Sequence, residues 1–220
     1  MKKATLKLTA LVMLMAGVTT SSAVAQSADP INVVTSAVPF LRISPDARSG
    51  GMGDVGIATS ADAYSGFWNL AKTPFAKSNT NIGVTYTPWL SDLGLNDVYL
   101  ASVSGYHKLD ENSAISAGLR YFSLGSIQFT DANGNALQSF RPREFGIDLG
   151  YSRKLSGKSG LGLGLRYISS DLAGGSVNGI SYKKGTSVAA DLHYYHNGLK
   201  ENGAGLNWGV TLSNLGAKIS

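Results

Sequence analysis

The stretch Phe145-Gly146-Ile147-Asp148-Leu149-Gly150-Tyr151-Ser152 decides the fold. Its odd-numbered residues are apolar or aromatic, whereas its even-numbered residues are small, polar or charged. Because successive side chains of a strand point to opposite faces, this period of two predicts a β-strand with one apolar face. The pattern returns at 161–167, where Leu and Tyr alternate with Gly and Arg.

Working outward, we expect seven such strands from residue 79 onward, separated by turn residues. The runs are about 8–11 residues long, the length that a tilted strand needs to cross a bilayer. Several apolar faces end in Tyr, an amphipathic residue that is frequent at membrane interfaces. The cores of the seven segments are 82–86, 98–106, 115–121, 145–151, 161–167, 188–194 and 206–212.

Four charged residues, Arg120, Asp148, Arg166 and Asp191, fall on the opposite face, which is otherwise small and polar. On a lipid face an Arg would cost about 2–4 kcal/mol at the midplane, so these residues are expected to line a polar lumen. A soluble sandwich or barrel also alternates, but its wet face normally carries Lys and Glu. Since only 15% of the residues are charged and 27 are Gly, the composition favours an all-β fold, a transmembrane antiparallel β-barrel.

The 220 residues include no Cys, which excludes disulfides, zinc–thiolate sites and a catalytic thiol. Residues 1–25 have the features of a secretory signal peptide, with Lys2, Lys3 and Lys7, an apolar run at 8–18 and a final Ala-Val-Ala. Without this segment, 16 Lys and Arg face 14 Asp and Glu. The resulting net charge of +2 gives little support to nucleic-acid binding.

The connections between the expected strands alternate in length. We expect the longer ones, 87–97, 125–143 and 170–186, to be external loops and the shorter ones to be periplasmic turns. Single-chain bacterial barrels have an even number of strands. Seven strands over 79–220 therefore predict that the chain is the N-terminal part of a longer barrel.

Several motifs resemble one protein family over nearly the whole chain after residue 25. They are PFL at 39–41, PDARSGGMGD at 45–54, YTPWL at 86–90, LRYFSLG at 119–125, YSR at 151–153 and RYISSDL at 166–172. These stretches are similar to the PorV (LptO) family, outer-membrane proteins of the type IX secretion system of Bacteroidetes. One departure is Trp68-Asn69-Leu70-Ala71, where the family usually has Pro in place of Leu70.

The resemblance implies a FadL-like barrel with an N-terminal hatch over 26–78, and no enzymatic activity. It implies binding to a large translocon subunit (SprA or Sov) and to the C-terminal signal domains of cargo proteins. Cargo would pass to an attachment complex, in which the sortase-like PorU joins it to anionic lipopolysaccharide. The alternative is a FadL-like outer-membrane transporter of hydrophobic small molecules. No cofactor and no metal is expected.

The Gly-rich segment before the first strand matches G-x-G-x-x-G at 51–56. A dinucleotide site would need a preceding strand and an acidic residue about 20 positions later, and neither is found. We therefore interpret it as a tightly packed hatch, in which Gly permits close backbone approach. The hatch residues singled out are Gly50, Gly51, Gly53, Asp54, Gly56, Trp68 and Asn69.

The expected external loop at 87–97 is unusually apolar for a segment in water, and exposed apolar clusters mark interaction sites. Its candidate partner-binding residues are Pro88, Trp89, Leu90, Leu93 and Leu95, although Trp89 alone also suits a membrane interface. Arg141 and Arg143 are further candidates, for cargo or for lipopolysaccharide. A lipid deacylase using His193 would need a nucleophile beside it, and no Ser motif points to this histidine.

Overall fold

The computed structural model describes residues 38–130, 133–172, 175–177, 180–182, 184–200, 204–217 and 219, and only the backbone of 175–177 and 180–182. All of them belong to one compact unit, Ala37–Ser220. The signal peptide expected over 1–25 and the first part of the expected hatch, 26–37, lie outside the described residues.

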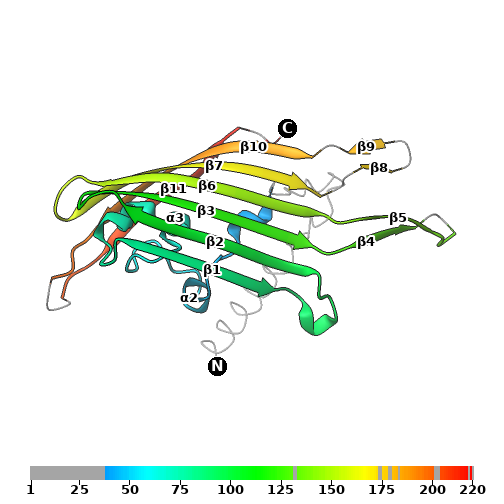
Figure 1. Ribbon diagram of the computed structural model, residues 1–220, viewed down its shortest axis with the longest axis horizontal. Coiled ribbons are helices and arrows are strands. Elements are labelled where there is room, and N and C mark those ends of the chain that lie inside the picture. Colours follow the sequence, from blue (N-terminus) through cyan, green and yellow to red (C-terminus); the bar gives the residue numbers. More distant parts are fainter. Residues whose placement is uncertain are drawn as a thin grey trace, which may run out of the picture. The chain divides into compact units, whose positions relative to one another are not determined.

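Seven long strands form one antiparallel sheet in the order β1-β2-β3-β6-β7-β10-β11 (Figure 1). This confirms the all-β, antiparallel class and a strand at each of the seven predicted places. In the described residues β1 and β11 each pair on one side only, so closure into a barrel stays a prediction. The strands are β1 (Thr80–Pro88), β2 (Val98–Lys108), β3 (Ser113–Leu124), β6 (Arg143–Lys154), β7 (Ser159–Asp171), β10 (Gly185–His196) and β11 (Trp208–Gly216).

The three longer connections lie at the same end of the sheet, as Figure 1 shows. One contains the single turn η3 (Ser91–Leu93), and the other two contain hairpins that extend beyond the sheet. The hairpins pair β4 (Ile127–Thr130) with β5 (Ala136–Phe140), and β8 (Gly175–Val177) with β9 (Ile180–Tyr182). We call this the loop end of the sheet, and the opposite end the turn end.

The two faces of the sheet are reversed relative to a soluble protein. The apolar face is exposed, with Leu149 at 61% and Leu165 at 64% of full exposure. The polar face is covered, so that Arg120 keeps 3% of its exposure and Ser152 none. An exposed apolar face that extends across the strands of a sheet is unfavourable in water, and it fits contact with lipid or with another protein.

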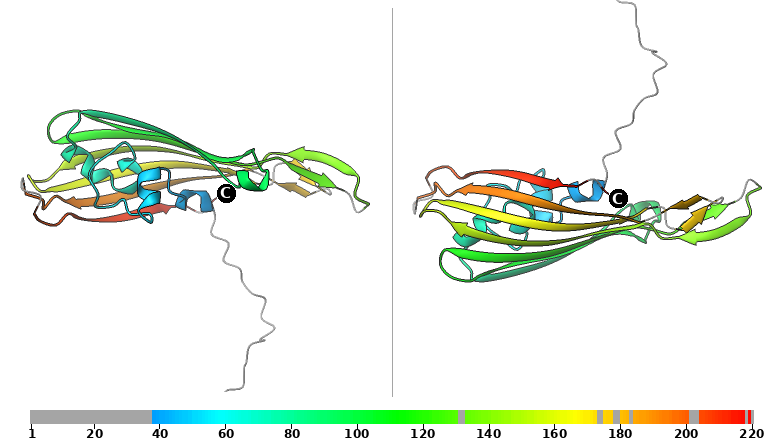
Figure 2. Two further views of the ribbon diagram at one scale, coloured as in Figure 1. Left: turned by 90° about the horizontal axis from the view of Figure 1, so that it is seen from below. Right: turned by 90° about the horizontal axis from the view of Figure 1, so that it is seen from above.

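Residues 38–76 cover the polar face with short helical turns, which lie within the curve of the sheet in Figure 2. Close packing is possible because the facing strands carry glycines: a Cβ at Gly162 would lie 3.0 Å from the Ala71 nitrogen. No described helix is long and apolar enough to cross a membrane. The turns are η1 (Pro39–Arg42), α2 (Ala47–Gly51), α3 (Ser65–Trp68) and η2 (Leu70–Phe75).

Candidate functional site

Beneath the hatch, the four charged residues predicted on the polar face form one chain of ion pairs. Asp148 stands between two arginines: its Oδ2 lies 3.3 Å from Arg120 Nη2, and its Oδ1 accepts from Arg166 Nε. Arg166 Nη2 in turn lies 2.8 Å from Asp191 Oδ2. The strand order explains the meeting, since β3, β6, β7 and β10 are consecutive neighbours and Asp148 is the cross-strand partner of Arg166.

A β-bulge in the last strand pair completes this chain. The register shifts between Ala190 and Leu192, and Asn214 opposite it takes a left-handed φ of 61°. Its side-chain oxygen accepts from Arg166 Nη1 at 2.5 Å, and its backbone N–H donates to Asp191 Oδ1 at 2.6 Å. Two cations and two anions therefore compensate each other in a buried site, with additional hydrogen bonds that such a site needs.

Arg120 also joins the sheet to the hatch. Its Nη1 donates to the carbonyl of Leu41 at 3.3 Å, and its guanidinium lies 4.7 Å from the ring centroid of Phe67. The ring of Phe40 is 5.9 Å away on the same guanidinium. Cation–π contacts of this kind strengthen when they are shielded from water, so Arg120 holds two hatch segments against β3.

The Gly-rich motif of the hatch follows a short helix and no strand, which leaves a dinucleotide site without its framework. At Gly50, Gly51 and Gly53 no heavy atom outside the neighbouring backbone lies within 3.5 Å of a Cβ built there, so close backbone approach at these three positions stays a prediction. Gly53 supplies a positive φ of 75° in the turn that continues through Asp54. Close approach holds at Gly56, where a Cβ would overlap the indole of Trp68.

Trp68 and Asn69 tie the parts of the hatch together. Asp46 caps helix α2 by accepting from Ser49 N at 2.8 Å, and its other oxygen accepts from Trp68 Nε1, also at 2.8 Å. Fully buried Asn69 donates to the carbonyls of Ile57 and Tyr194 at 3.1 and 2.9 Å. The bond to Tyr194 fixes the hatch to β10.

Leu70, the departure from the family motif, begins the turn η2, with Asn69 as its N-cap. The cap oxygen accepts from Ala71 N at 3.1 Å. This first position tolerates Pro, and Leu70 instead fills the space that Gly150 and Gly162 leave on the sheet.

Lys72 is a feature of the hatch that sequence reasoning missed. It is fully buried, and its Nζ donates to the Gly56 carbonyl at 2.5 Å and to Thr59 Oγ1 at 3.1 Å. No carboxylate of the described residues lies within ion-pair distance of it. Burial therefore lowers the pKa of Lys72 to about 8. Nothing in the sequence separates this lysine from a surface one.

His193 is buried beside Asp191 on the polar face, with 1% exposure. Its Nδ1 lies 3.3 Å from Thr211 Oγ1, whose hydroxyl donates to the Trp68 carbonyl. Its Nε2 has no partner among the described residues. The described part of the chain thus shows no Ser–His pair for a deacylase, and no group of acidic and His residues in it could hold a metal.

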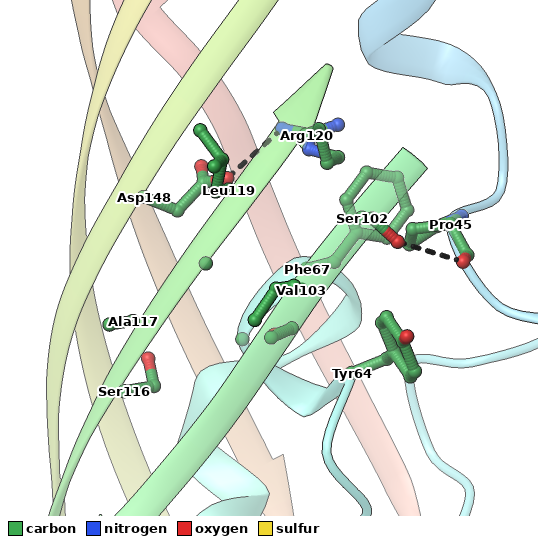
Figure 3. A pocket seen from close by; sticks show the side chains of 13 residues that line it. Pro45, Tyr64, Phe67, Ser102, Val103, Ser116, Ala117, Leu119, Arg120 and Asp148 are labelled. Atoms are coloured by element: carbon green, nitrogen blue, oxygen red, sulfur yellow. Dashed lines mark hydrogen bonds and ion pairs between the residues drawn. The ribbon is translucent and has the colours of Figure 1, made fainter. Parts of the chain in front are cut away.

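Between the hatch and strands β2 and β3 lies a cavity of about 20 Å³, room for about one water molecule (Figure 3). Figure 3 shows Arg120 and Asp148 at one side of it and Tyr64 at another. Ser102 Oγ donates to the Pro45 carbonyl at 3.1 Å along its wall.

The apolar residues of the loop at 87–97 are exposed beyond the loop end of the sheet. Leu93 in η3 is the most exposed, at 74%, and Leu90 and Leu95 are also exposed. Trp89 is partly held by an edge contact with Phe122, with 6.1 Å between the ring centroids. The structure does not bring Arg141 and Arg143 into this cluster; they line a separate hollow near the start of β6.

Aromatic residues form a row at each end of the apolar face. At the loop end Tyr99 neighbours Tyr86 and Tyr121, with ring centroids 5.2 and 6.1 Å apart. At the turn end Tyr194 and Trp208 are 5.0 Å apart.

Strand β6 crosses both rows, since its outward residues run Arg143, Phe145, Ile147, Leu149, Tyr151 and Arg153. The interval from Arg143 to Arg153 spans about 34 Å, or about 26 Å of height at a tilt of about 40°. The two arginines are therefore far enough apart to flank the apolar band of an outer-membrane barrel, which is about 25 Å tall.

Two comparisons with known proteins complete the description. A family model described as "Type IX secretion system protein PorV" matches residues 25–220. A comparison with curated proteins found no match.

Proposed function

The chain belongs to the PorV family and is a component of the type IX secretion system, and from this premise we propose its role. It is a non-enzymatic protein of the outer membrane that binds the translocon and the C-terminal signal domains of cargo. It then delivers cargo to the attachment complex. The observation that carries the proposal is the reversed sheet, apolar outside and filled with polar groups inside.

The outward face supports placement in the outer membrane. Its aliphatic middle lies between two aromatic rows, and Arg143 and Arg153 lie beyond them on β6. This sequence of chemistry along a strand is that of a lipid-facing barrel wall. Among the described residues β1 and β11 each have one unpaired edge, which would leave backbone groups unsatisfied in lipid, so we propose that further strands close the barrel.

The inward face supports a secretion component over the transporter alternative. A transporter of hydrophobic molecules needs an apolar path past the hatch. In the described residues that route is crossed by the Arg120–Asp148 and Arg166–Asp191 pairs, which are buried under hatch residues. Asn69 and Arg120 additionally fasten the hatch to the sheet.

Since the hatch covers the polar face of the described sheet, we propose that partners bind at the loop end. Exposed Trp89, Leu90, Leu93 and Leu95 form an apolar patch next to η3, of the chemistry that a protein partner covers. We assign this patch to a large SprA- or Sov-like translocon subunit or to the cargo signal domain. A PorU-like sortase of the attachment complex would receive the cargo afterwards.

The test is co-isolation of the full protein from outer membranes. Leu93→Asp should reduce recovery of the translocon or of signal-bearing cargo at least about fivefold, because a charge would be buried in the contact. Leu155→Asp is the matched control, since Leu155 is exposed at the turn end. Recovery of neither partner with the unchanged protein would refute the role, and equal recovery with both variants would refute the patch.

A further inference from the structure

A hollow at the loop end of the outward face has no part in the role proposed above. It has a volume of about 220 Å³ and lies among the ends of β2, β3 and β6. The lining side chains used below are Asp97, Tyr99, Tyr121, Ser123, Arg141 and Arg143.

The register of the sheet makes the hollow. Ser123 is the cross-strand partner of Tyr99 on one side and of Arg143 on the other. A small side chain between two long ones leaves a depression on the face. Beyond it the chain turns away at Gly125, which has a φ of 84°, and at buried Pro142.

The charge of the hollow is unbalanced toward positive. Arg141 and Arg143 are exposed, and neither forms an ion pair with a carboxylate among the described residues. The single carboxylate in the lining, Asp97, accepts from Ser126 N at 2.7 Å. Asp171 is the cross-strand partner of Arg143 but is beyond ion-pair distance.

The hollow also lies at the depth where the proposed membrane placement puts the lipid headgroups. Tyr99 and Tyr121 belong to the aromatic row of the loop end, and Lys184 stands 5.2 Å from the ring centroid of Phe145 in the same region. Cations just beyond an aromatic row occupy the level of lipid headgroups. Guanidinium groups bind phosphate with paired N–H donors, and the two phenols add further hydrogen-bonding groups.

We infer that this hollow binds the phosphate of a glycolipid headgroup in the leaflet at the loop end. The inference rests on the proposed membrane placement, and it is independent of which proteins bind the Leu93 patch. A lipid is favoured over a soluble anion because the hollow opens on the lipid-facing side, where acyl chains would lie against Tyr121 and the aliphatic band below it.

The test uses the full protein in detergent and a diphosphorylated glycolipid, with bound lipid counted by native mass spectrometry. Arg141→Gln with Arg143→Gln should weaken binding about tenfold or more, since charge-assisted hydrogen bonds from a guanidinium to phosphate contribute about tenfold each. Arg153→Gln, at the other end of the same face of β6, is the matched control and should bind as the unchanged protein does. The dephosphorylated glycolipid should bind weakly to all three.

Equal lipid binding by the double variant and the control would overturn the inference. Displacement of the lipid by millimolar inorganic phosphate or by an acidic peptide would also overturn it, in favour of a soluble ligand. Co-isolation of translocon and cargo with the same variants separates the two proposals. If the double variant loses lipid binding but still recovers translocon and cargo, both proposals are upheld. If lipid binds but neither partner is recovered, only the secretion role is refuted.

Discussion

Neutralising Asp148 tests the buried ion chain that joins four strands. Asp148→Asn leaves the guanidinium groups of Arg120 and Arg166 facing one carboxylate, that of Asp191. Removing one partner of a buried pair costs about 3–5 kcal/mol. The side chain of Asp148 keeps 19% of its exposure, which reduces the expected loss to about 2–4 kcal/mol.

The assay is urea unfolding of the full protein in lipid bilayers, followed by heat-modifiable mobility on gels. Asp92→Asn is the control, because Asp92 is exposed in η3 and forms no ion pair among the described residues. Arg120→Met together with Asp148→Asn restores a balanced Arg166–Asp191 pair. The double variant should therefore lose at least about 2 kcal/mol less than the sum of the single variants. A single-variant loss below about 1 kcal/mol, or strict additivity, would refute the reasoning.

Two further perturbations address the outward face and the hatch. Leu165→Arg places a charge in the middle of the apolar face and should cost about 2–4 kcal/mol in bilayers, whereas a surface Arg on a sheet in water would change unfolding by about 0.5 kcal/mol or less. Lys72 has a folded pKa near 8, below its ordinary 10.5, so the unfolded chain binds its proton more tightly. The unfolding free energy should thus rise by about 2–3 kcal/mol between about pH 8 and 10.5 relative to Lys72→Met, and parallel pH curves would contradict this.

The strands were predictable because an apolar outward face and a small, polar inward face give the sequence a clear period of two. The odd-numbered residues from Phe145 to Tyr151 and from Leu161 to Tyr167 lie on the outward face as expected. The same periodicity put Arg120 and Asp148 on one face. It could not show that they touch, since this requires β3 and β6 to be neighbours across the β4–β5 hairpin.

Other parts of the site depend on geometry that has no local sequence signal. The left-handed Asn214 in the β-bulge, and the burial of Lys72, follow from how the last strand and the hatch meet the rest of the sheet. The sequence cannot separate a packing role from a turn at Gly50, Gly51 and Gly53, because a Gly in a motif does not say whether it serves a close contact or a turn. At Gly53 the structure shows a turn, because the residue has a positive φ of 75°.

Locking the hatch tests whether the proposed secretion role requires the hatch to move. Thr73 in η2 and Ser152 in β6 are fully buried, and their side-chain oxygens are in contact at 2.7 Å, so we expect Cys side chains at the two positions to lie within reach of each other. Since the chain has no Cys, Thr73→Cys with Ser152→Cys would give a single cross-link from hatch to sheet. If partners bind at the loop end, the oxidised protein should support cargo secretion as the reduced one does. Secretion that stops on oxidation and returns with reductant would show that the hatch must move, and each single-Cys variant controls for the substitutions.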